Sequence, residues 1–147
     1  MSYHPFLMGA NILAYQKEGK KYGMCCSWAQ MIDYDKIAML IGATSITGKS
    51  LAVEQTVGVS ALASEQTALA NHFGYGHSDQ MDKFVSVPFI QDGDAILIKE
   101  AKVKMKCCVK NILALPRMEE DYFVIMDILS YQEDQSKVFL DALDILS

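Results

Sequence analysis

Short hydrophobic runs separated by polar turns dominate the hydropathy pattern of this chain. The runs 11–17 and 22–31 flank the polar, glycine-containing turn 18–21, and this arrangement predicts a β-hairpin. Further runs of strand length lie at 37–41, 57–62, 95–98, 101–115 and 122–129. Because most neighbouring runs are joined by short turns, the pattern predicts a mostly β protein, an antiparallel barrel of six or seven strands with a few short helices.

Two segments have helical rather than strand character. The first is predicted over 48–55 and follows a hydroxyl-rich loop. The second is predicted over 65–73, with Ser64 as its N-cap and Gly74 at the position where a helix commonly ends. A short amphipathic tail at 138–146 is expected to dock on the domain or on a second copy. With no linker or internal repeat, a single domain over 1–147 is expected.

The strand predicted over 101–115 alternates between apolar and basic residues. This alternation is typical of a half-buried strand with one solvated face. The basic face either receives an anionic partner or a nucleotide, or simply keeps the sheet soluble and protects its edge; we favour the second interpretation. The residues of this face are Lys102, Lys104, Lys106, Cys108 and Lys110.

The net charge of −5 argues against a nucleic-acid-binding protein, which needs clustered cations. No apolar stretch is long enough to span a membrane, and the N-terminus lacks the pattern of a signal peptide.

The cysteines form two adjacent pairs, 25–26 and 107–108, whose side chains would point to opposite faces of a strand. They are therefore interpreted as small buried hydrophobes in a reducing cytoplasm, although a thiol role at the first pair stays open. The histidines match no metal spacing, so no metal site is predicted.

The most chemically informative stretch is the loop ATSITGKS at 43–50, between a buried strand and a helix start. Backbone amides, short hydroxyls and an ammonium group suit a phosphate. The loop nearly matches the P-loop pattern G-x-x-x-x-G-K-S/T, but five residues rather than four separate Gly42 from Gly48, and this disfavours a nucleotide triphosphatase. Two interpretations stay open: a helix capped by Thr47 with solvated Lys49 and Ser50, or a phosphate site of another kind.

Several pieces of the chain occur in an order known from one protein family. They are the strand CCSWAQM, the helix start TGKS, the strand VGVSAL, the helix SEQTALANHFG, the triplet Asp82-Lys83-Phe84 and the strand AKVKMKCCV. Over about residues 11–130, this order resembles the flavin reductase-like, FMN-binding split-barrel family, which includes flavoredoxins. The resemblance implies a six-stranded antiparallel split barrel, a homodimer, and a flavin near the dimer interface.

The resemblance also implies which residues hold FMN. The isoalloxazine ring would rest on Ser27, Trp28 and Ala29 of the second strand; packing in a core or interface remains the alternative for Trp28. The phosphate and ribityl chain would be held by Ala43, Thr44, Ser45, Thr47, Gly48, Lys49 and Ser50. Lys49 would neutralise the phosphate, and Thr47 and Ser50 would donate hydrogen bonds to it. Phe73 and Lys83 would lie near the ring or the partner subunit.

The function implied by this family is FMN-dependent transfer of hydride or electrons, with NAD(P)H or a redox protein as partner. Many reductases of the family carry a Gly-Asp-His triplet, which the corresponding stretch RMEEDYFVIMDIL lacks. This departure leaves two alternatives beside the reductase. One is a non-enzymatic, flavoredoxin-like electron carrier, and the other is a split-barrel module for pyridoxal phosphate or another phosphate-bearing cofactor.

Overall fold

A computed structural model describes residues 6–74 and 83–141 of the chain. The elements are β1 (Asn11–Lys17), β2 (Lys20–Cys26), β3 (Ala29–Asp33), β4 (Lys36–Gly42), α1 (Ile46–Ser50), β5 (Thr56–Ala61), α2 (Thr67–Gly74), β6 (Phe89–Asp92), β7 (Ala95–Ile98), β8 (Val103–Ala114) and β9 (Asp121–Glu133).

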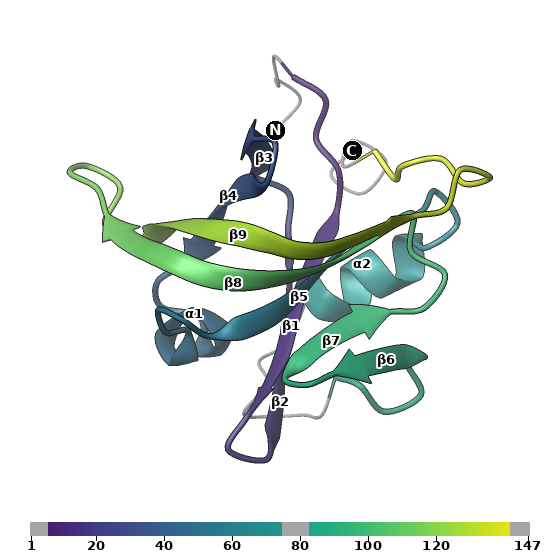
Figure 1. Ribbon diagram of the computed structural model, residues 1–147, viewed down its shortest axis with the longest axis horizontal. Helices are drawn as coiled ribbons and strands as arrows, with labels where there is room; N and C mark the ends of the chain where they lie inside the picture. The colour runs from purple at the N-terminus through teal and green to yellow at the C-terminus, as the bar shows by residue number, and fades with distance from the viewer. Residues whose placement is uncertain (1–5, 75–82, 142–147) are drawn as a thin grey trace.

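Within the described residues, these strands form one antiparallel sheet in the order β3-β4-β9-β8-β5-β1-β7-β6, and β2 pairs with β1 (Figure 1). The ends of this path, β3 and β6, do not pair with each other, so the barrel is split rather than closed. The prediction of a mostly β barrel with a few short helices is confirmed. The described part holds nine strands, more than the six or seven that the sequence predicted.

Strand β1 is buried on both faces and separates two hydrophobic clusters. Leu13 and Tyr15 point into the cluster enclosed by β4, β5, β8 and β9. Ile12 and Ala14 point the other way, into the cluster under α2 and β7. Successive side chains of a strand alternate in direction, and burying each large apolar one contributes about 1.5–3 kcal/mol. The strand therefore anchors both halves of the fold.

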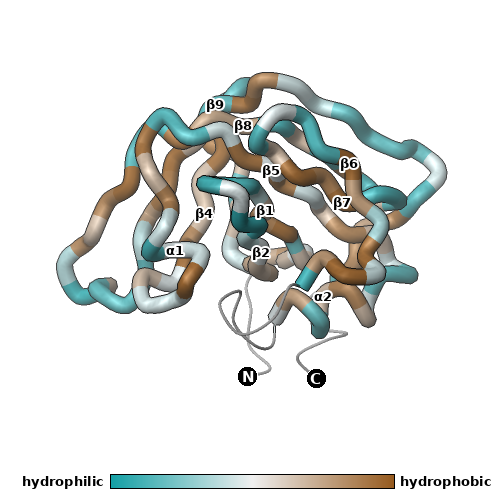
Figure 2. The backbone as a smooth tube through the Cα atoms, turned by 90° about the horizontal axis from the view of Figure 1, so that it is seen from below, coloured by the Kyte–Doolittle hydropathy of each residue, from teal (hydrophilic) through white to brown (hydrophobic). Residues whose placement is uncertain are grey.

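The two helices lie on opposite sides of the β1–β2 hairpin (Figures 1 and 2). Figure 2 shows hydrophobic residues along the central strands and hydrophilic residues at the β1–β2 turn. Helix α2 packs on β2 through Gly23, where a Cβ atom would lie within 2.9 Å of the rings of Phe73 and Phe84. Helix α1 sits at the end of β4, beside the other side of the same hairpin.

The prediction of one strand over 22–31 is wrong, because the chain bends between β2 and β3. Strand β2 ends where Cys26 pairs with Asn11 at the start of β1. The chain then crosses to β4, where the amide of Leu40 donates to the carbonyl of Trp28 at 3.0 Å. The residues Ser27 and Trp28 therefore form the bend rather than part of a strand.

The prediction of a helix over 48–55 is also wrong in its bounds. Helix α1 spans Ile46–Ser50, and the backbone is already extended at Leu51, with φ −68° and ψ 138°. Its N-cap is Ser45 rather than Thr47, because the Ser45 hydroxyl accepts from the amide of Gly48. The second predicted helix exists as α2, and it begins two residues later than predicted, at Thr67, so the prediction of Ser64 as its N-cap is wrong.

The basic face predicted along 101–115 is only partly solvated. Lys102 is 7% exposed, and its Nζ donates to Glu133 Oε2 at 2.8 Å and to the carbonyl of Asp134 at 3.1 Å. The expectation that it faces water is therefore wrong. Lys106 and Lys110 lie nearer the surface and also carry carboxylate partners, at 3.1 Å in each case. A register shift between Lys106 and Cys107 interrupts the regular alternation.

The start of the predicted C-terminal tail docks on its own domain. The amide of Ser64 donates to the carbonyl of Val138 at 2.8 Å, and the amide of Leu140 donates to the carbonyl of Leu62 at 3.0 Å. Leu140 itself is buried in the cluster under α2. The rest of the predicted tail, and the predicted loop with His77, lie outside the described residues.

Candidate functional site

The loop between β4 and α1 is held in one tight conformation. The Ser45 hydroxyl donates to the carbonyl of Gly42 at 2.7 Å and accepts from the amide of Gly48 at 2.9 Å. A Cβ atom on Gly48 would lie 2.0 Å from that same carbonyl oxygen, a distance that real structures do not show. Position 48 therefore requires glycine, and the two hydrogen bonds of Ser45 hold the loop in its conformation.

The inner side of this loop is fastened to β1. Thr47 is 3% exposed, and Tyr15 Oη donates to its carbonyl at 2.8 Å. The Tyr15 hydroxyl is also hydrogen-bonded to Ser50 Oγ, and Lys17 Nζ donates to the carbonyl of Ser50. Burial raises the pKa of Tyr15 well above its ordinary value, so the phenol stays neutral. Thr47 and Ser50 therefore attach α1 to the barrel instead of presenting their hydroxyls at the loop surface.

The outer side of the loop presents a different set of groups. Thr44 and Lys49 are exposed, while Ala43 and Ser45 are partly exposed. Within the described part of the chain, Lys49 has no carboxylate partner among the seven ion pairs. Its ammonium group is therefore available to an anion, and the hydroxyl of Thr44 lies on the same loop.

The bend between β2 and β3 borders a cavity of about 340 Å³ whose lining includes Ser27, Trp28 and Ala29. The indole of Trp28 is 55% exposed. The thiol of Cys26 donates to the carbonyl of Leu40 at 3.0 Å, which fixes the bend against β4. Strands rise by about 3.3 Å per residue, so this contact lies only about 7 Å from the end of β4, where the loop begins. The structure thus brings the predicted ring platform and the predicted phosphate loop to the same end of β4.

Phe73 and Lys83 lie elsewhere in the fold. Phe73 is 1% exposed and packs on Phe84, with 5.1 Å between the ring centroids. Lys83 is buried, and its Nζ donates to the carbonyls of Gly23 at 3.3 Å and Phe73 at 3.2 Å. Burial lowers the pKa of Lys83. Both residues belong to the packing of α2 on β2, across the β1–β2 hairpin from α1 (Figure 1).

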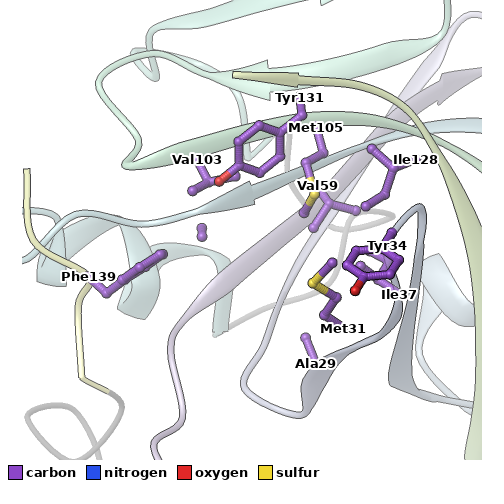
Figure 3. A pocket seen from close by; sticks show the side chains of 11 residues that line it. Ala29, Met31, Tyr34, Ile37, Val59, Val103, Met105, Ile128, Tyr131 and Phe139 are labelled. Carbon is purple, nitrogen blue, oxygen red and sulfur yellow. The ribbon is translucent and has the colours of Figure 1, made fainter. Parts of the chain in front are cut away.

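A second, larger cavity of about 540 Å³ opens at the mouth of the barrel. Ala29 borders both cavities; beyond it, Gln30 and Ile32 face the smaller one while Met31 faces the larger. Figure 3 shows the side chains of β5, β8 and β9 opposite those of the β3–β4 hairpin, with Phe139 at one flank. Sequence reasoning missed this cavity because its walls come from segments far apart in the chain and carry no polar motif.

The cysteines offer no reactive thiolate. Burial raises the pKa of Cys25 to about 11 and those of Cys26 and Cys107 to about 12, so these thiols are protonated at neutral pH. All four cysteines are free; Cys26, Cys107 and Cys108 are buried, as predicted, and Cys25 is partly exposed. Among the residues that the structure describes, no group of three or more His, Cys, Asp or Glu could hold a metal ion. The same residues include no helix long and apolar enough to cross a bilayer.

Comparisons with known proteins agree with this fold. Residues 4–139 match the flavin reductase like domain. An NADH:FAD oxidoreductase of Streptomyces globisporus is 16% identical, with a TM-score of 0.81 over 91% of this chain and 79% of that chain. A flavoredoxin of Methanosarcina acetivorans is 14% identical, with a TM-score of 0.79 over 95% of this chain and 87% of that chain. An FMN-binding protein of Thermus thermophilus is 12% identical, with a TM-score of 0.79 over 90% of this chain and 74% of that chain.

A comparison with curated protein sequences gives no match. At these low identities the solved structures establish the fold alone, whereas the domain match extends over nearly the whole chain. The chain therefore belongs to the flavin reductase like domain family.

Proposed function

We propose that this protein binds FMN and acts as an oxidoreductase that passes hydride or electrons through it. The family supports a flavin-related oxidoreductase role. One observation supports the choice of FMN. The exposed ammonium group of Lys49, which has no carboxylate partner among the described residues, and the apolar cavity at Trp28 lie at the same end of β4. A molecule with a flat apolar ring and one terminal phosphate suits both. Bound flavin would supply the redox chemistry, and the protein supplies binding, orientation and electrostatics.

Different residues of the loop would bind the phosphate and maintain the loop conformation. Lys49 would neutralise the phosphate, and Thr44 would donate a hydrogen bond to it. Ser45 and Gly48 hold the loop in shape, as their contacts with Gly42 indicate. The resemblance assigned the hydroxyls of Thr47 and Ser50 to the phosphate. Thr47 is buried and the Ser50 hydroxyl is bonded to Tyr15 and to the Thr47 carbonyl, so we leave both out of the proposed contacts.

The ring platform would be the bend at residues 27–29. Its backbone is fixed by the contacts of Cys26 and Trp28 with Leu40, and this rigidity favours a defined ring position. The exposed indole of Trp28 gives an aromatic face on which a flavin ring packs favourably. Phe73 and Lys83 have no part in this proposal, because the structure buries them under α2.

We also propose a homodimer that uses the β3 edge of the sheet. Strand β3 is an end strand, and Ile32 on it is exposed, as are the nearby Trp28 and Leu7, which line the smaller cavity with it. An exposed apolar edge is a liability in a monomer and is commonly covered by a second chain. Sedimentation of the purified protein tests the dimer.

The four free cysteines support a reducing compartment, and we propose the cytoplasm.

Replacing Lys49 with alanine should weaken FMN binding about tenfold to a hundredfold and leave riboflavin binding nearly unchanged. A charge-assisted hydrogen bond contributes about 1.5–3 kcal/mol, and only FMN carries the phosphate that would receive it. Quenching of flavin fluorescence measures both affinities. Lys99→Ala, which removes another exposed lysine far from the loop, is the matched control and should change neither. Equal losses for the two flavins would place the phosphate away from Lys49.

A second candidate is a non-enzymatic electron carrier. Residues 117–129, which lead into and form β9, lack the glycine and histidine that many reductases of the family carry there. Steady-state oxidation of NADH or NADPH in the presence of free flavin separates the two candidates. We expect turnover well above the uncatalysed rate, and turnover at the uncatalysed rate would favour the carrier. The visible spectrum of the protein as purified distinguishes a flavin from pyridoxal phosphate, the remaining alternative.

A further inference from the structure

We propose that the larger cavity, at the mouth of the barrel, binds an uncharged, apolar small molecule at a site separate from the FMN loop. Its volume of about 540 Å³ lies within the range of about 300–1,000 Å³ that is typical of small-molecule sites. Its walls come from β3, β4, β5, β8, β9 and the C-terminal segment, which meet around one concave space (Figure 3). This inference does not depend on the flavin proposal.

The floor of the cavity is made of side chains that alternate along central strands. Val59 and Ala61 on β5, and Val103 and Met105 on β8, face the cavity at every second position. Val59, Ala61 and Val103 are buried under its surface. A site lined in this way removes apolar surface of a ligand from water without leaving polar groups of the protein unpaired.

Charged side chains beside the β9 wall of the cavity pair with one another. Tyr131, which lines the cavity, is hydrogen-bonded to Glu133, and Glu133 pairs with Lys102 at 2.8 Å. The Nζ atom of Lys102 lies 5.4 Å from the ring centroid of Phe139, another lining residue. Among the described residues that line the cavity, none is charged. A charged ligand would lose water here without gaining a counter-charge, so the site selects neutral molecules.

The flank of the cavity formed by Phe139 is fixed in place. Phe139 forms an isolated β-bridge with Ala63, and the neighbouring Lys137 pairs with Glu100 at 2.7 Å. The rim is open, because Met31 is 55% and Tyr34 94% exposed. A preformed wall with an accessible opening suits a ligand that enters from solvent.

Fluorescence titration with N-phenyl-1-naphthylamine, a neutral aromatic probe, tests this site on the full-length protein. We expect a saturable rise in fluorescence that corresponds to one probe per chain. Ala61→Phe projects a ring into the cavity and should weaken probe binding at least tenfold. Met31→Glu places a charge at the exposed rim, where folding is not at risk, and should also weaken it at least tenfold. Gln30→Phe, which adds a ring at an exposed position of the smaller cavity, is the matched control and should leave probe affinity within twofold.

Three results would overturn the inference. The first is absence of saturable probe binding, or binding that neither Ala61→Phe nor Met31→Glu weakens. The second is stoichiometric displacement of the probe by FMN, which would make this cavity the flavin site. The third is conversion of a dimer to a monomer by Met31→Glu with stronger probe binding, which would mean that a second copy fills the cavity. Probe binding without any FMN binding would support this site and reject only the flavin proposal, so the two fail independently.

Discussion

Replacing Gly48 with alanine should lower FMN affinity at least tenfold and destabilise the protein by about 1–3 kcal/mol, the usual cost of overpacking. The new Cβ atom would lie 2.0 Å from the carbonyl oxygen of Gly42 and 2.9 Å from Ser45 Oγ. Since the closest obstacle is backbone, either the end of β4 or the start of α1 must move. That movement breaks the Ser45 cap, which itself contributes about 1 kcal/mol. FMN fluorescence quenching and urea unfolding measure the two effects.

The matched control for this variant lies in the same loop. A Cβ atom on Gly42 would have its nearest contact with Ser45 Cβ, at an ordinary 3.8 Å. Gly42→Ala should therefore bind FMN within about twofold of the parent protein, because nothing must shift. If Gly48→Ala unfolds earlier in urea but binds FMN as the parent does, the phosphate is held elsewhere.

Gly58→Ala should destabilise the protein by about 3 kcal/mol or more, the upper end of what overpacking costs. Gly58 sits in the middle of β5, paired with Ala14 of β1 and Lys106 of β8. A Cβ atom there would lie 2.0 Å from the carbonyl oxygen of Ile96 on β7. This carbonyl belongs to β7, which crosses over β5. Strand β7 cannot move away without disrupting the hydrophobic cluster under α2, which contains Ile96.

Urea unfolding followed by circular dichroism measures this loss. Gly9→Ala is the control, since the nearest contact of its Cβ atom would be the carbonyl of Leu140 at 3.7 Å. We expect the control to stay within about 0.5 kcal/mol of the parent, as surface substitutions usually do. A Gly58→Ala protein as stable as the control would show that β5 and β7 do not approach as closely as described.

The sequence predicts most of the barrel because its strands follow a simple physical pattern. The hairpin of β1 and β2, the buried strands β4 and β5, and β7 were all expected from apolar runs bounded by polar turns. The loop of the candidate site was also expected, because short hydroxyls, glycine and lysine follow a buried strand there. These features are local, so a window of a few residues contains the information that specifies them.

The features that the sequence did not predict depend on contacts between distant residues. The bend at Ser27 and Trp28 has no glycine or proline and is created by pairing with β4. Ser45 and Thr47 are both good N-caps, and the contact of Ser45 with the Gly42 carbonyl decides between them. The alternating pattern predicts a solvated Lys102, yet Lys102 is buried and Glu133, 31 residues away, supplies its carboxylate partner. The larger cavity could not be predicted either, because its lining residues are far apart in the sequence and meet only in the folded chain.

A phosphate-bearing flavin held at the end of β4 is the central proposal for this protein. The most direct measurement is a parallel titration of the purified protein with FMN and with riboflavin, followed by quenching of flavin fluorescence. We expect FMN to bind one per chain, with micromolar or better affinity and at least tenfold more tightly than riboflavin. Absence of FMN quenching, or equal affinity for the two flavins, would contradict the assignment of this loop.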